Sequence, residues 1–192
     1  RLQALQARIR PHFLFNCMNT IASLTRREPA LAEQAIEDLA DLFRLSLQES
    51  QSWLSLEAEF DICRRYLRTE QLRLGERLQV DWQVDSLPGD ACVPALLVQP
   101  LLENAVYHGI EPLATGGYIS IHGEQEGEQL SITIENPLAA GATLHNQGNR
   151  VAQENIRQRL MNAFGYRAGL EISTGVNHYQ VRLVFPYDRE PC

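Results

Sequence analysis

The apolar residues of this 192-residue chain change their spacing once, at Gly75, and that change limits the possible folds more than any other feature. Before Gly75 they recur at intervals of three and four, as on one face of an α-helix. After it they alternate with polar residues at Leu78, Val80, Trp82 and Val84, which is the pattern of a half-buried strand. The sequence therefore predicts an all-helical module followed by a mixed α/β part.

The helical module is predicted to contain three helices. Their expected ranges are 1 to about 27, 29 to about 49, and 56 to 74. Pro29 suits the first position of the second helix, Ser55 is an N-cap for the third, and Gly75 ends it. Because long apolar stripes without a sheet to cover need a partner surface, we expect the helices to dimerise into a bundle.

The second part alternates predicted strands with predicted helices. Strands are expected at 78–84, 118–124, 130–136, 170–174 and 179–185, and helices at about 95–108 and 151–164. Two helices that cover one face of a single sheet indicate a two-layer α/β sandwich. The predicted fold class is α+β, with a helical module over residues 1–75 and a sandwich domain over residues 76–192.

The composition excludes several classes of function. A net charge of −7 and a pI of 5.2 argue against nucleic-acid binding, which requires a basic face. All 17 basic residues are Arg, so an anion here must be bound by Arg, backbone N–H groups or a metal. The most apolar segment, residues 93–106, is too short and too polar to span a bilayer. Because the chain opens without Met inside a helical pattern, we expect a preceding region to be missing.

Four cysteines are scattered along the chain without a Cys-x-x-Cys pair. They are Cys17, Cys63, Cys92 and Cys192. This spacing predicts reduced thiols in a cytosolic setting, with neither zinc nor disulfide bonds.

The N-terminal helix carries the string Pro-His-Phe-Leu-Phe-Asn at residues 11–16. On a helix His12 and Asn16 share one face, while Phe13 and Cys17 lie on the adjoining apolar stripe. The imidazole is thus expected between a buried seam and water, where a nucleophile has rigid support and access to a phosphate donor. A lone histidine beside a bend at Pro11 is more often structural, and only the whole string favours the functional interpretation.

A second informative segment is Gln-Pro-Leu-Leu-Glu-Asn-Ala-x-x-His-Gly at residues 99–109. The amide oxygen of Asn104 can bind Mg²⁺, and Glu103 can orient a coordinated water. Alone, such a pair near a helix end is equally a C-terminal cap followed by Gly109.

Together with the segment Tyr66-Leu67…Glu70…Arg73-Leu74-Gly75, these strings resemble the LytS-like sensor histidine kinases over nearly the whole chain. The resemblance implies a dimeric phosphotransfer module joined to an ATP-binding domain of the gyrase/Hsp90/kinase type. It implies that His12 takes the γ-phosphoryl group of ATP and passes it to an aspartate of a cognate response regulator, of the LytTR type. It also implies an upstream membrane sensor, and hence the cytoplasmic portion of a bacterial inner-membrane protein.

The resemblance further implies a set of ATP-binding residues, with Asn104 binding Mg²⁺. They are Glu103, Asn104, His108, Asn136, Gly148, Arg150 and Asn155. Asn136 stands where the family has an Asp that reads the adenine amino group, and Pro137 follows it where a glycine turn is usual. Gly148 alone remains of the glycine-rich loop, which hinders backbone approach to phosphates. Arg150 either offsets this loss by pairing with a phosphate or is simply solvated.

No residue can be assigned from the sequence as the general base for His12. Phe13 follows the histidine where many histidine kinases have an acidic residue, and Asn16 can hydrogen-bond the ring but cannot act as a base. The first hypothesis is an active autokinase. The alternative is a scaffold or phosphatase with a degenerate nucleotide site that controls its regulator by docking. A conformational ATPase of the same fold is disfavoured by the acceptor string.

Overall fold

The computed structural model describes residues 11–47, 53–138 and 147–192. Its helices are α2 (Pro11–Leu24), α3 (Pro29–Leu47), α4 (Leu56–Leu74), α5 (Gln99–Ala105) and α6 (Gln147–Phe164). Its strands are β1 (Trp53–Ser55), β2 (Leu78–Gln83), β3 (Cys92–Pro94), β4 (Gly117–Glu126), β5 (Gln129–Pro137), β6 (Gly169–Thr174) and β7 (His178–Pro186). Short helical turns follow α4 (Gly75–Arg77), α5 (Val106–Ile110, a π-helix) and α6 (Gly165–Arg167).

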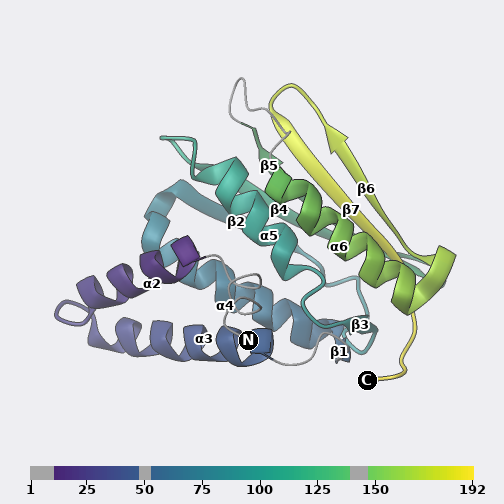
Figure 1. Ribbon diagram of the computed structural model, residues 1–192, viewed down its shortest axis with the longest axis horizontal. Coiled ribbons are helices and arrows are strands. Elements are labelled where there is room, and N and C mark those ends of the chain that lie inside the picture. Colours follow the sequence, from purple (N-terminus) through teal and green to yellow (C-terminus); the bar gives the residue numbers. More distant parts are fainter. Residues whose placement is uncertain (1–10, 48–52, 139–146) are drawn as a thin grey trace.

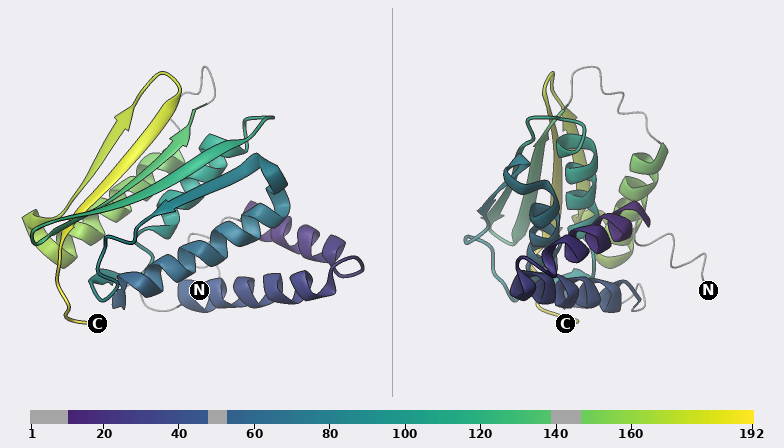
Figure 2. Two further views of the ribbon diagram at one scale, coloured as in Figure 1. Left: turned by 180° about the vertical axis from the view of Figure 1, so that it is seen from behind. Right: turned by 90° about the vertical axis from the view of Figure 1, so that its left-hand side faces the viewer.

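Five strands form one mixed sheet in the order β2-β4-β5-β7-β6, with β2 and β4 parallel and the other neighbours antiparallel. Helices α5 and α6 cover one face (Figure 1), and no helix of the described ranges covers the other (Figure 2, left). Alternate residues of the central strands, such as Ile132 and Leu183, are fully buried beneath the helices. The predicted two-layer sandwich and the α+β class are confirmed.

Helix α4 begins and ends at the predicted residues. The Ser55 hydroxyl accepts a hydrogen bond from the Ala58 N–H at 3.2 Å, and Gly75 adopts a positive φ of 58° at the other end. The helix lies between the sandwich and the pair α2–α3 (Figure 1). Its buried Leu56 and Phe60 belong to the same hydrophobic core as the sheet, while Leu72 contacts the smaller core of α2 and α3. Helix α4 therefore connects the two packing units.

Helices α2 and α3 form an antiparallel pair that rests on α4. Their small core contains Cys17, Ile21, Ala32, Ala35 and Leu39. Arg68 of α4 holds α3 by donating to both carboxylate oxygens of the buried Asp38, at 3.1 and 3.2 Å. None of the described helices is at once long enough and apolar enough to cross a bilayer.

Two details of the secondary structure differ from the sequence prediction. The first 75 residues were expected to hold no strand, but β1 pairs antiparallel with β3, with Ser55 opposite Cys92. Three-residue strands are too short for alternation to reveal. The helix expected from about residue 95 begins only at Gln99, because Leu96 has a positive φ of 57°, and it continues past Gly109 as the π-helical turn.

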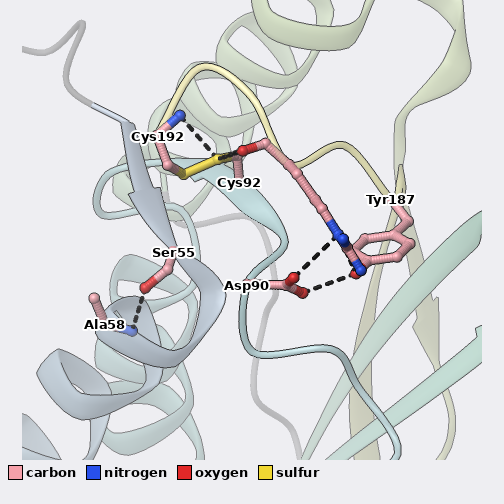
Figure 3. The surroundings of a disulfide bond; sticks show 7 residues. Ser55, Ala58, Asp90, Cys92, Tyr187 and Cys192 are labelled. Atoms are coloured by element: carbon pink, nitrogen blue, oxygen red, sulfur yellow. Dashed lines mark hydrogen bonds and ion pairs between the residues drawn. A yellow bond between two sulfur atoms is a disulfide. The ribbon is translucent and has the colours of Figure 1, made fainter.

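The prediction that every cysteine is reduced is wrong for two of the four. Cys92 of β3 forms a disulfide with Cys192, with Cα atoms 5.6 Å apart (Figure 3). The chain after β7 reaches β3 because the Cys92 N–H donates to Asp188 O at 2.7 Å, and the Tyr187 hydroxyl donates to Asp90 at 2.8 Å. A sequence separation of 100 residues leaves no local pattern by which to predict this bond. Cys17 and Cys63 are free and buried.

Some expectations concern residues outside the described ranges. They are the helix before residue 11, the bend just before His12, and most of the loop after β5.

Candidate functional site

His12 lies in the first turn of α2, with its side chain exposed. The amide nitrogen of Asn16 is 3.2 Å from Nδ1 and 3.4 Å from Nε2 of the ring. Because these distances are nearly equal, Asn16 contacts the ring without distinguishing its two nitrogens. The neighbouring Phe13 packs against Tyr66 of α4, with ring centroids 5.3 Å apart. The imidazole therefore lies at the edge of a packed contact, as the helical pattern predicted.

A small, partly open cavity adjoins this histidine, and we call it the His12 cavity. Its lining residues are His12, Phe13, Tyr66, Glu70, Glu103, Val106, Tyr107 and Glu111. They come from α2, α4, α5, the π-helical turn and the residue that follows it, so α2 meets the sandwich here. The sequence singled out His12 and Glu103 separately, and the structure brings both to one cavity.

Buried charges form one wall of the His12 cavity. Arg73 of α4 donates to the Glu70 carboxylate, with Nε 2.9 Å from Oε2, and also pairs with Glu111. The side chain of Glu70 is only 3% exposed. Arg77 donates to the carbonyl oxygens of Glu111 and Leu113 at 3.1 and 2.9 Å, which fixes the segment after the π-helical turn against α4. A network of ion pairs and hydrogen bonds from α4 and the turn after it therefore supports one side of the cavity.

Burial raises the pKa of the Glu70 carboxyl above its ordinary value. The nearby charge of Arg73 opposes this effect, Glu111 adds to it, and the charge of His12 lowers the pKa. The same carboxylate acts on Cys17 of α2, whose pKa rises to about 12, mainly through burial and then through the charge of Glu70. Glu70 thus interacts electrostatically with two residues of α2, His12 and Cys17.

Helix α5 and its π-helical extension hold the residues of the second motif. Glu103 is half-buried on the His12 cavity and accepts from the Gln99 side chain, whereas Asn104 is buried. His108 is half-buried, and its ring meets that of Tyr107 edge to face, with centroids 4.7 Å apart. Single π-turns within helices occur frequently at functional sites. An amide such as that of Asn104 supplies the neutral oxygen that Mg²⁺ accepts.

The end of β5 suits recognition of an adenine amino group. Asn136 is buried there, and its Nδ2 donates to Pro137 O at 2.8 Å, so its oxygen remains an acceptor. A Cβ at Gly109 would collide with this amide. The absence of a side chain at Gly109 therefore allows Asn136 to lie against the end of the π-helical turn. Asn136 thus offers a neutral acceptor at the end of β5, where the sequence resemblance implies contact with the adenine amino group.

The remaining predicted residues lie in α6. Gly148 and Arg150 are in its first turn. The side chain of Arg150 lies outside the described part, so its proposed phosphate contact remains a prediction. Asn155 is exposed on the same helix.

Sequence reasoning did not assign roles to Glu70, Arg73 and Glu111. A signal was present for the first two, because Tyr66, Glu70 and Arg73 recur at intervals of four and three. That spacing places all three on one face of α4. Glu111 follows the π-helical turn and carries no comparable local signal.

Comparisons with known proteins show which proteins the chain is similar to. Residues 1–78 match the family Histidine kinase. The chain is 30% identical over 190 residues to the sensor histidine kinase BtsS of Escherichia coli, covering 98% of this chain and 34% of that protein. It is 33% identical over 198 residues to the sensor protein LytS of Staphylococcus saprophyticus, covering 97% of this chain and 34% of that protein. The chain thus spans about a third of the length of the curated relatives it matches.

Solved structures agree on the fold. The Acinetobacter baumannii histidine kinase AdeS superposes with a TM-score of 0.52 at 16% identity, over 83% of this chain and 80% of that one. The histidine kinase domain of the Erythrobacter litoralis blue-light activated kinase EL346 gives 0.52 at 21% identity, over 97% and 93%. The α+β fold is that of histidine kinase catalytic domains. In sequence, over nearly its whole length, the chain is similar to about a third of the length of LytS-like sensor histidine kinases, and in fold it is similar to histidine kinase catalytic domains.

Proposed function

We propose that this chain is the phosphotransfer and ATP-binding part of a two-component sensor histidine kinase, with His12 as phosphoacceptor. The observation that carries the proposal is the His12 cavity, in which the histidine of α2 and Glu103 of α5 form parts of one lining. A histidine that merely packed the helices would not need to be exposed beside the second motif. The division into a phosphotransfer module, residues 1–75, and a catalytic domain, residues 76–192, is part of the proposal.

The proposed chemistry is transfer of the γ-phosphoryl group of ATP to one nitrogen of His12. Such transfer requires in-line positioning and charge neutralisation more than covalent help. Mg²⁺, when bound, supplies the neutralising charge on the phosphates, with Asn104 as its ligand and Glu103 supporting it. Asn136 accepts from the adenine amino group, and a neutral imidazole is already nucleophilic near neutral pH. The remaining proposed ATP-binding residues are His108, Gly148, Arg150 and Asn155.

The proposed partners follow from the surface and from the relatives. Phe15, Met18 and Ile36 leave 69%, 56% and 52% of their surface exposed on α2 and α3, which supports homodimerisation through these helices. The phosphoryl group would pass to an aspartate of a cognate response regulator, of the LytTR type. We further propose that the chain is the cytoplasmic portion of a longer inner-membrane sensor. Within the LytS-like kinases, the motifs most resemble those of the alginate-regulatory sensor AlgZ (FimS).

The direct test is incubation with γ-labelled ATP and Mg²⁺. We expect acid-labile label on the wild-type chain, none on His12→Gln, and an unchanged amount on His122→Gln, which alters an exposed histidine of the sheet. Absence of label under conditions that phosphorylate a known relative, or label that persists in His12→Gln, contradicts the proposal.

The second candidate is a scaffold or phosphatase that controls the regulator without efficient autokinase activity. The neutral Asn136, followed by Pro137 at the end of β5, favours it. Calorimetry with ATP separates the two functions, since a pure scaffold gives no Mg²⁺-dependent heat. For the active kinase we expect Asn104→Asp to abolish binding and Arg150→Ala to weaken it.

A further inference from the structure

Neither neighbour of His12 on its own helix can supply negative charge to the ring. Phe13 is apolar, and Asn16 is a neutral amide that contacts both ring nitrogens almost equally. An imidazole that attacks phosphorus through one nitrogen becomes positively charged, because its other nitrogen still carries a proton. A carboxylate close to that ring would stabilise the charge and orient the N–H group.

Three carboxylates line the His12 cavity, and their surroundings distinguish them. The Glu103 carboxylate accepts a hydrogen bond from the Gln99 side chain of its own helix. Glu111 pairs with Arg73, and its main chain is held by Arg77. Glu70 also pairs with Arg73, but it is the most buried of the three, with 3% of its side chain exposed, and its charge interacts with His12.

The groups that face Glu70 come from every element around it. Helix α2 contributes His12 and Cys17, and α4 contributes Arg73. Helix α5 and its π-helical extension contribute Glu103 and Tyr107, and the segment after them contributes Glu111. Arg73 is shared with Glu111, so one cation neutralises two carboxylates. The carboxyl groups that line the cavity together with His12 therefore outnumber the one arginine that pairs with them.

We propose that Glu70 is a positioning residue for His12, which stabilises the positively charged imidazole formed when one ring nitrogen attacks phosphorus. The inference rests on the proposed function. In the step itself, that nitrogen bonds to the γ-phosphorus, the bond from this phosphorus to the β–γ bridging oxygen breaks, and ADP leaves with the electron pair. The proton on the other nitrogen then departs to solvent. Glu70 takes no part in bond making and acts only through the ring. The acidic group that the sequence lacks beside His12 is thus supplied from α4.

The test uses two phosphate donors on the whole chain. With ATP and Mg²⁺, Glu70→Gln keeps the side-chain shape and loses its charge, and we expect labelling at saturating ATP to slow about 10- to 100-fold with an unchanged KM for ATP. With phosphoramidate, a small donor that transfers its phosphoryl group to histidine and releases ammonia, we expect the same fold-change by mass spectrometry. Glu76→Gln removes an exposed charge at the end of α4 and should leave both rates unchanged.

A second variant separates positioning from mere neutralisation of Arg73. If Glu70 serves only to balance that arginine, Glu70→Gln/Arg73→Gln restores the rate, which overturns the inference. If it acts on the ring, the double variant stays as slow as Glu70→Gln. An effect with ATP but none with phosphoramidate also overturns it. A wild-type chain that reacts with phosphoramidate in a Glu70-dependent way but not with ATP would contradict the kinase and leave the positioning role intact.

Discussion

Helix α4 carries two buried glutamates on one face, Glu59 and Glu70, and their surroundings differ completely. Eleven residues apart, they are offset by only about 20° around the helix. The Glu59 carboxylate accepts from the backbone N–H groups of Leu96 and Val98, both at 2.8 Å, and of Gln99 at 3.4 Å. Glu70 is held by side chains that carry charge, chiefly Arg73.

The difference shows how one residue type serves the fold in one place and the site in another. Backbone donors fix the position of a carboxylate, so Glu59 ties α4 to the start of α5 and stabilises the unusual turn at Leu96. Arg159 of α6 donates to the carbonyl of Leu96 at 3.0 Å and completes this junction. A charged side chain can instead stabilise a charge that forms on a neighbouring group, which is the role we propose for Glu70. The junction at Glu59 is therefore structural, whereas Glu70 lines the candidate site.

The largest expected effect is the loss of stability in Glu59→Ala. Removing the carboxylate leaves one buried and two part-buried N–H groups without their acceptor, so we expect the free energy of unfolding to fall by about 3–5 kcal/mol. For Glu70→Ala we expect about 1–2 kcal/mol, because Arg73 keeps Glu111 as a partner and the cavity is partly open. Urea unfolding monitored by circular dichroism measures both. Equal losses would show that the two carboxylates play the same role.

The pH dependence of stability gives a smaller effect with a definite sign. Burial raises the pKa of the Glu59 carboxyl above its ordinary value of 4.5. The opposing effects are smaller and come from backbone hydrogen bonds, donated by Val98, Leu96 and Gln99, and from the charge of Arg159. The folded state therefore binds more protons than the unfolded state above about pH 4.5, and the free energy of unfolding falls as the pH rises through this window. In Glu59→Gln this contribution is absent. We therefore expect the free energy of unfolding to fall less over this pH window than in the wild type, by about 1.4 kcal/mol for each unit of pKa shift. Parallel curves for variant and wild type would show that Glu59 does not titrate there.

The sequence predicts those features that depend on residues close together in the chain. Periodicity identified the helices and the main sheet, and the spacing of His12 and Asn16 predicted their contact, because these are local relationships. Strand alternation also placed Asn136 correctly at the end of β5. Other contacts join segments far apart in the chain: those of Glu59 with the start of α5, those that bring His12 and Glu111 to Glu70, the β1–β3 pair and the disulfide. Only tertiary packing brings such partners together, so no local pattern marks them.

Two free cysteines provide a finer test, since each lies near one of the glutamates. Burial, followed by the charge of Glu70, raises the pKa of Cys17 to about 12. Burial, followed by the charge of Glu59, raises the pKa of Cys63 well above its ordinary value. Cys63 lies in the main core, whereas Cys17 lies in the small core of α2 and α3. We expect a thiol reagent to modify Cys17 of the native chain at least about ten-fold faster than Cys63, as peptide mass spectrometry would show. Equal rates would mean that both regions open only together.

The smallest effect is the change in thiol reactivity caused by Glu70→Gln. Removing this negative charge favours the Cys17 thiolate, so we expect modification of Cys17 to accelerate about two- to five-fold. Cys63, whose pKa depends on burial and then on Glu59, should keep its rate and serves as the internal control. Acceleration of Cys17 alone indicates that Glu70 acts locally, through its charge, on the helix that carries His12. If both cysteines accelerate, the variant has loosened the whole fold, and Glu70 is a structural residue of the same kind as Glu59.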